Sequence, residues 1–140
     1  MNAYDKLLAS YKELEERVQR LEENPETLKD RWFKRSLAYK GRRLTIDNLM
    51  LLVSDYTGIA VSEIKGNGRM SDIMFARQAY CYLAYRTVKK NWTLDFIGDL
   101  IDKNHATVIN AIKRMEDRID TDESARQDIA AMAEVIKGMI

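Results

Sequence analysis

The feature that most constrains the fold of this chain is a pair of helical apolar patterns separated by a short turn at residues 102–104. The first pattern spans residues 94–101 (LDFIGDLI) and follows Thr93, whose hydroxyl can cap a helix. The second begins after Asn104, another capping residue, and carries apolar residues at helical spacing: Val108, Ile109, Ile112, Met115 and Ile119. Two helices joined in this way are typical of a helix-turn-helix, although many other helical hairpins share the spacing.

The start of the second helix offers side chains that can form hydrogen bonds. Asn104, His105 and Thr107 can bond base edges in a major groove, where the first turn of a recognition helix lies. Lys113 and Arg114 are either phosphate contacts or ordinary surface cations. His105 is the single histidine, and no orienting acid and nucleophile are recognisable around it, so we do not expect an enzyme.

Further helices are predicted between residues 44 and 90. Thr45 can cap a helix, and Gly58 suits the position just past its end. Ser71 or Asp72 can cap a second helix, expected at about 72–90. The expected inward residues of these two helices are Ile46, Leu49, Met50, Val53, Tyr56, Ala76, Ala79, Tyr80, Leu83 and Val88.

Between these helices, Gly66, Asn67 and Gly68 predict an exposed loop, with the cations Lys65 and Arg69 beside it. Met74 and Cys81 are interpreted as core fillers. A single cysteine cannot form an internal disulfide, which fits a reducing compartment. With no membrane-spanning segment and no signal peptide expected, we predict a cytoplasmic protein.

The first 24 residues repeat with a heptad period. Tyrosine or valine occupies each a position and leucine each d position, at Tyr4, Leu7, Tyr11, Leu14, Val18 and Leu21. This pattern favours a parallel homodimer, but a short amphipathic helix can equally pack on its own domain. Pro25, preceded by Asn24, is expected to end the helix.

Charge is segregated along the chain, although the formal net charge is only +1. Residues 1–26 carry a net charge of −3, residues 27–43 carry +6, and residues 120–140 carry −3. The basic stretch predicts a second helix that ends at Gly41, with Leu28, Trp32 and Leu37 facing inward. It is either a solvated face on a linker or a cationic arm beside DNA.

Three blocks of sequence, taken in order, resemble the C-terminal DNA-binding domain of the bacterial replication initiator DnaA. They are FARQAYCYLA at 75–84, LDFIGDLI at 94–101 and KNHATVINAIKRME at 103–116. The resemblance covers roughly residues 44–119. It implies an all-α fold of the DnaA C-terminal, Trp-repressor-like type, in which the third block is the recognition helix.

The resemblance also implies roles for particular residues. Asn104, His105, Ala106 and Thr107 match the family's base-contacting positions, and Lys103 joins them at the start of the helix. Arg77 matches an arginine used in the minor groove. The phosphate contacts are expected from Lys65, Arg69, Lys113 and Arg114.

The chain departs from the family pattern at several of these positions. Asn104 replaces an acidic residue and can bond adenine, while Ala106 keeps only the methyl group of a threonine. The family's basic loop is reduced to Lys65 and Arg69, which predicts fewer phosphate contacts. Residues 1–140 contain no G-x-x-x-x-G-K-[ST] motif, so we expect the DNA-binding domain without the family's ATPase, as a phage or mobile element could use it.

The sequence therefore predicts four parts: a coiled-coil helix at 1–24, a basic linker helix at 25–43, the helix-turn-helix domain at 44–120 and a C-terminal amphipathic helix at 121–140, with its helical residues at about 122–138. The predicted function is sequence-specific binding of double-stranded DNA in replication or transcription. No cofactor, metal, nucleotide or membrane partner is expected. The alternative is a protein-interaction or oligomerisation module whose helix-turn-helix no longer binds DNA.

Overall fold

The computed structural model describes the backbone of residues 2–23 and 28–140, and the side chains of residues 2–17 and 30–140. Every regular element in these ranges is helical, as the sequence predicted. The chain forms two compact units, Met1–Lys34 and Arg35–Ile140. None of the helices within the described ranges combines the length and the apolar character that crossing a membrane requires.

The first unit contains helix α1 (Ala3–Glu23) and most of helix α2 (Leu28–Ser36). Asn2 caps α1, because its side-chain oxygen accepts a hydrogen bond from the backbone N–H of Asp5 at 2.8 Å. The heptad residues that are described are exposed: Tyr4 and Leu7 by 70%, Tyr11 and Leu14 by 58%. The side chains of Val18, Leu21 and Leu28, and residues Asn24 and Pro25, lie outside what the structure describes.

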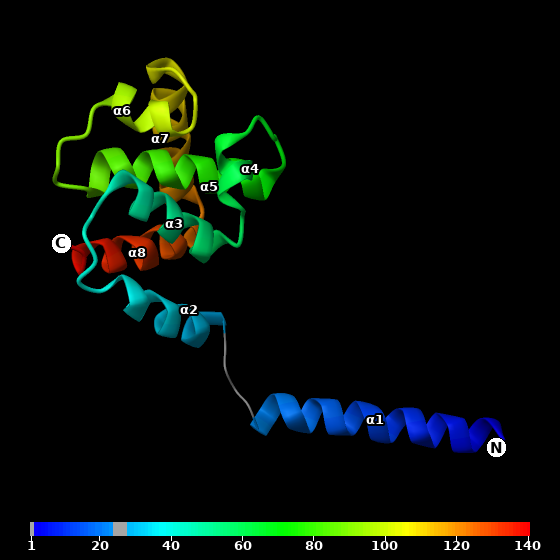
Figure 1. The fold of residues 1–140 in the computed structure, drawn as a ribbon. Coiled ribbons are helices and arrows are strands. Elements are labelled where there is room, and N and C mark those ends of the chain that lie inside the picture. The colour runs from blue at the N-terminus through cyan, green and yellow to red at the C-terminus, as the bar shows by residue number, and fades with distance from the viewer. Residues whose placement is uncertain (1, 24–27) are drawn as a thin grey trace. The chain divides into compact units, whose positions relative to one another are not determined.

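The second unit continues with a 3₁₀ turn η1 (Leu37–Tyr39) and helices α3 (Ile46–Thr57), α4 (Val61–Lys65) and α5 (Ser71–Tyr82). A π-helical turn η2 (Leu83–Thr87) follows, and then α6 (Leu94–Leu100), α7 (His105–Thr121) and α8 (Glu123–Lys137). Helix α5 is central and packs against α3, α4 and α7 (Figure 1). The core of this unit consists of large apolar side chains from α3 to α8 and from η2, including Leu49, Ile64, Tyr80, Leu83, Ile97, Met115 and Met132.

Several local predictions are confirmed. The hydroxyls of Thr45 and Thr93 accept hydrogen bonds from the N–H groups of Asn48 and Phe96, both at 3.1 Å. Gly58 follows α3 in the left-handed region, with φ of 73°. Cys81 is fully buried, and this burial raises the pKa of its thiol to about 12.

Two predictions about α5 are wrong. Ser71 or Asp72 was expected to cap the helix, but the N-cap residue is Met70 and no side chain caps the helix. The side-chain oxygen of Asp72 instead accepts from the neighbouring N–H of Ile73 at 2.9 Å. The regular helix ends at Tyr82 and not near residue 90, because the chain widens into η2 and then turns extended at Val88, whose side chain is thereby buried.

Leu37 was expected to face inward, but it is 54% exposed. The 3₁₀ turn η1 presents Tyr39 to the core in its place, where the phenol donates a hydrogen bond to the carboxylate of Asp55. A helix with three residues per turn presents different positions inward from those of an α-helix, so the α-helical spacing gave the wrong residue.

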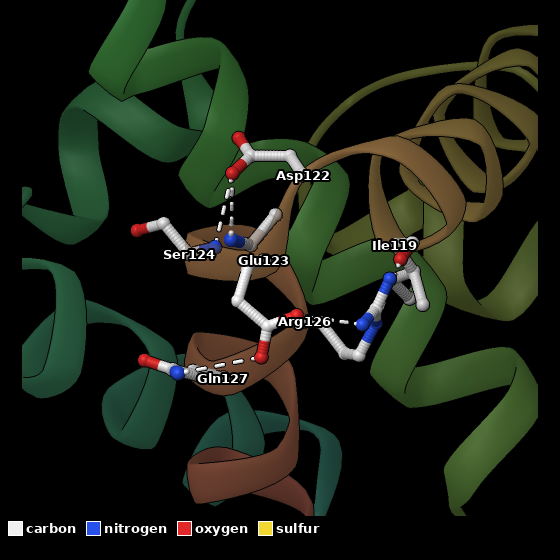
Figure 2. Close-up of polar contacts among 7 residues, drawn as sticks. Ile119, Asp122, Glu123, Ser124, Arg126 and Gln127 are labelled. Atoms are coloured by element: carbon white, nitrogen blue, oxygen red, sulfur yellow. Dashed lines mark hydrogen bonds and ion pairs between the residues drawn. The ribbon is translucent and has the colours of Figure 1, made fainter.

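The C-terminal helix closes the second unit, and α8 lies near the predicted 122–138. Figure 2 shows its junction with α7, where Asp122 caps α8 by accepting from the N–H of Ser124 at 3.0 Å. Arg126 donates to the carbonyl of Ile119 at 3.1 Å and to Glu123 at 2.7 Å. Beyond α8, Ile140 donates its N–H to the carbonyl of Arg42 at 2.8 Å, which fastens the C-terminal residues to the segment before α3.

Candidate nucleic-acid interface

Helices α6 and α7 form a helix-turn-helix with a tight turn. The N–H of Lys103 donates to the carbonyl of Gly98 at 3.0 Å, and Asp102 adopts a left-handed conformation with φ of 54°. A Cβ atom at Gly98 would lie well inside contact distance of the backbone oxygen of Lys103 and 3.2 Å from Val108. Only glycine therefore allows the turn to fold back so closely on α6.

The first turn of α7 is uncovered. Asn104, His105, Ala106 and Thr107 are all exposed, and Asn104 caps the helix as the sequence predicted. Its side-chain oxygen accepts from the N–H of Thr107 at 2.9 Å and from the Thr107 hydroxyl at 3.1 Å. Asn104 therefore cannot offer both its oxygen and its amide to an adenine while the cap is intact.

His105 lies beside an acidic side chain of the preceding helix. Its Nδ1 is 3.5 Å from a carboxylate oxygen of Asp95, and the two side chains are 64% and 79% exposed. Because both groups face solvent, their attraction is weak and readily broken. The imidazole can therefore turn toward another partner at little cost.

The apolar and polar faces of α7 separate cleanly. Val108, Ala111, Ile112 and Met115 are buried, while Asn110, Lys113 and Arg114 are exposed. Ala106, Asn110 and Lys113 follow one another at spacings of four and three residues, so they share one face of the helix. The exposed start of α7 thus continues into a basic stretch on the same side.

The loop between α4 and α5 also reaches the start of α7. Lys65 and Arg69, at its two ends, are exposed. The ammonium group of Lys103 donates a hydrogen bond to the side-chain oxygen of Asn67. The structure thereby brings the two cations of the loop and the start of α7 into one neighbourhood, which sequence spacing alone did not predict.

Arg77 forms hydrogen bonds with the protein's own backbone in the chain without DNA. Its Nε donates to the carbonyl of Ile64 at 2.8 Å, and Nη1 to that of Gly68 at 3.1 Å. Its Nη2 donates to the carbonyls of Glu63 at 3.1 Å and Gly66 at 2.7 Å. These bonds engage four of the five guanidinium N–H groups of Arg77.

The part of the basic segment that belongs to the second unit, residues 35–43, lies apart from the start of α7. Figure 1 shows the chain from η1 to the start of α3 near the C-terminal end of α8, away from α6. Arg35 donates to the carbonyl of Asp55 at 3.2 Å, and the guanidinium of Arg42 lies 5.4 Å from the centre of the Tyr39 ring. These two cations have structural partners and lie apart from the start of α7.

Helix α6, its tight turn and the exposed start of α7 define a helix-turn-helix domain. Residues 46–115 match the family described as the bacterial DnaA protein helix-turn-helix, and this match spans half of the chain. The chain belongs to that family, whose helix-turn-helix is a DNA-binding domain.

Similar proteins include chromosomal replication initiators. The chain is 28% identical over 137 residues to the chromosomal replication initiator protein DnaA of Burkholderia multivorans, a match covering 97% of the chain and 25% of the relative. It is 29% identical over 87 residues to the chromosomal replication initiator protein DnaA 1 of Protochlamydia amoebophila, covering 62% of the chain and 19% of the relative. The chain thus spans a quarter or less of the length of these relatives.

Proposed function

We propose that this chain binds double-stranded DNA in a sequence-specific manner, with the first turn of α7 in the major groove. The observation that carries the proposal is the exposure of His105, Ala106 and Thr107 at the start of the second helix of a DnaA-type helix-turn-helix. In such motifs this part of the helix reaches the base edges. In this proposal the protein acts by occupying a DNA site, and it does not change the DNA chemically.

Within this proposal the base-reading side chains have unequal roles. His105 and Thr107 offer hydrogen-bonding groups, and the methyl group of Ala106 suits contact with a thymine methyl. Asn104 and Lys103 contribute secondarily, because the Asn104 oxygen caps α7 and the Lys103 ammonium group bonds Asn67. Readout therefore depends chiefly on His105 and Thr107.

Four exposed cations hold phosphates in this proposal: Lys65 and Arg69 from the loop, and Lys113 and Arg114 from α7. Each phosphate contact releases counterions, so each contributes about 0.9 to the slope of log affinity against log salt concentration. This slope counts the contacts and can be measured without knowing the recognised sequence.

The test is fluorescence anisotropy with duplexes selected from a random pool, at several salt concentrations. We expect Lys113→Ala to lower the salt slope by about 0.9 for every duplex. His105→Ala should instead reduce the preference for the selected duplex, because base contacts specify while phosphate contacts position. Lys137→Ala on α8, which removes a cation paired with Glu134, is the matched control and should leave both quantities unchanged.

Absence of binding to every duplex at low salt would contradict the proposal. That outcome would favour the alternative of a protein-interaction module. The reduction of the basic loop to two cations, and the hydrogen bonds that occupy Lys103 and Arg77, are the observations that support this alternative.

A parallel homodimer through α1 is a second part of the proposal. The described heptad residues are exposed along one stripe, and in a parallel pair Arg17 would meet Glu22 of the other copy. Two helix-turn-helix domains carried on one dimer would engage two sites with raised effective concentration. We also propose that this DNA binding serves replication or transcription in the cytoplasm, in a phage or mobile element.

Sedimentation of the full chain tests the dimer. We expect Leu7→Glu, at a d position, to convert a dimer to a monomer, because it places a charge in the apolar seam. Ala9→Glu adds the same charge at an f position, away from the seam, and is the matched control. A monomeric wild-type chain would contradict this part of the proposal and leave DNA binding untouched.

A further inference from the structure

We propose that a second cationic surface of the second unit binds phosphates of the duplex beside the recognised site, on one side of that site only. We call it the flank surface, and it consists of five exposed cations from two segments: Lys40, Arg42, Arg43, Lys89 and Lys90. The inference rests on the proposed function, because a flanking duplex is present only when α7 occupies its site. It adds phosphate contacts to those of Lys65, Arg69, Lys113 and Arg114.

The two segments carry positive charge only. Residues 35–44 and 86–93 contain arginines and lysines but no aspartate or glutamate. Two of their cations are engaged elsewhere, since Arg35 donates to the carbonyl of Asp55 and Arg86 pairs with Glu116 at 2.9 Å. The cations that remain are those of the flank surface. Like charges gathered on one face attract an anionic partner, and the phosphate backbone of DNA is such a partner.

Lys90 joins the two segments. Its ammonium group donates to the backbone carbonyl of Leu44 at 2.6 Å, so the loop at 88–93 lies against the segment before α3. This bond uses one of the three donors of the ammonium group and leaves its charge in place. Figure 1 shows both segments along one edge of the second unit. Cations that are far apart in the sequence therefore form one surface.

The segment before α3 is already ordered by backbone hydrogen bonds. The N–H of Gly41 donates to the carbonyl of Gly138 at 3.0 Å, and the N–H of Ile140 donates to the carbonyl of Arg42 at 2.8 Å. These bonds use backbone groups, and the side chains of Arg42 and Arg43 stay exposed. Because this backbone does not have to be ordered on binding, phosphate contacts here cost less conformational entropy than contacts from a disordered arm.

An open hollow connects the flank surface with the base-reading end of α7. Asn91, from the loop at 88–93, and His105, the first residue of α7, both line this hollow. The loop that carries Lys89 and Lys90 thus borders the region where α7 meets DNA in the proposed function. A duplex that continues past the major-groove contact in this direction reaches the flank surface next. One domain has this surface on one edge only, so the contact is one-sided.

Three duplexes test the proposal. One is the shortest selected duplex that is still preferred, and each of the others carries about one helical turn, about 10 base pairs, of unrelated sequence at one end. The full chain carries Leu7→Glu, because pairing through α1 would bring a second domain to the added DNA. We expect one extension to increase the salt slope by about 1.8 or more, since Arg43 and Lys89 each gain a phosphate. The extension at the other end should have little effect.

Removing two charges of the flank surface gives the matching protein variant. Arg43→Gln/Lys89→Gln should reduce the extra slope by about 1.8 and leave binding to the shortest duplex unchanged. Arg126→Gln is the control, because it removes a cation of the same unit at the α7–α8 junction (Figure 2). This control should change neither the extra slope nor binding to the shortest duplex.

Neutral methylphosphonates in the responding extension provide a second measurement. They remove phosphate charge and leave the bases unchanged. They should weaken binding of the Leu7→Glu chain, and weaken it much less once Arg43→Gln/Lys89→Gln is added, because the two changes remove the same contacts. Equal weakening of both chains would overturn the inference.

Failure of the inference is distinguishable from failure of the proposed function. Equal effects of the two extensions, or an extra slope that persists in Arg43→Gln/Lys89→Gln, would overturn the inference and leave the proposed function standing. An unchanged slope with both extensions would do the same, and would assign these cations to a different anionic partner. A chain that does not bind the shortest duplex at low salt contradicts the proposed function, and the inference fails with it.

Discussion

Helices α1 and α7 are both capped by an asparagine and both carry an apolar stripe, but the surroundings of the two stripes differ. In α7, Val108 and Met115 are fully buried, whereas in α1 the exposed fractions of Leu7 and Leu14 are 70% and 58%. The α7 stripe is covered by α5, α6 and α8 of its own unit. A similar apolar stripe thus packs in the core in α7 and is exposed at the described heptad residues of α1.

Among the variants that test this comparison, Met115→Ala is expected to lower the free energy of unfolding most. Met115 is fully buried, so the substitution leaves a cavity and should lower the free energy of unfolding of the second unit by about 3 kcal/mol. Urea unfolding followed by Trp92 fluorescence, in a Trp32→Phe background, measures it. Leu14→Ala in α1 is the control, and an equal loss there would break the comparison.

A somewhat smaller loss is expected from Gly98→Ala. The new methyl group would collide with the backbone oxygen of Lys103, which cannot move without opening the turn. We expect a loss of about 2 kcal/mol of unfolding free energy in the same assay, as in other overpacked sites. At Gly138 the nearest atom to an added Cβ is at an ordinary 3.5 Å, so Gly138→Ala should change stability by less than about 0.5 kcal/mol.

Alkaline pH should also weaken the second unit selectively. The pKa of the Cys81 thiol is raised from 9.0 to about 12 in the folded chain, so the unfolded chain loses this proton first. Stability is therefore constant with respect to this group below about pH 9 and falls as the pH rises toward 12, by about 1.4 kcal/mol at pH 10. Burial raises the pKa of Tyr80 as well, which adds to the loss at higher pH.

Urea midpoints measured between pH 8 and pH 10 test this prediction. Cys81→Ala removes the thiol and should reduce the pH dependence by the contribution of this group, while the buried tyrosines keep theirs. A wild-type midpoint that did not change over this range would contradict the raised thiol pKa.

The smallest effect compares the two asparagine caps directly. Asn104→Ala removes the acceptor for the N–H of Thr107 and should cost the second unit about 1 kcal/mol. Asn2→Ala removes the equivalent acceptor in α1 and should lower helicity without shifting the unfolding of the second unit. A shift of the same size with Asn2→Ala would show that the two units unfold together.

Features that depend on a few neighbouring residues are predictable from the sequence. The caps at Thr45, Thr93 and Asn104 and the glycine after α3 were found because each uses partners within four residues. The predictions for the start and end of α5 and for Leu37 are wrong. At the end of α5 and at Leu37, non-α-helical turns change which residues face the core. The bonds of Tyr39 to Asp55 and Tyr56 to Asp128 were missed, because they join positions far apart in the chain.

The sequence by itself determined the helical class, the helix-turn-helix and the residues at the start of its second helix, because apolar periodicity and capping are local properties of the chain. Only the tertiary structure decided which donors are already engaged. The sequence does not show which groups Arg77 and Lys103 bond, because only folding brings them within hydrogen-bonding distance of the α4–α5 loop. A hydrogen bond needs its two groups in one place, and that coincidence arises only when α4, α5 and α7 pack.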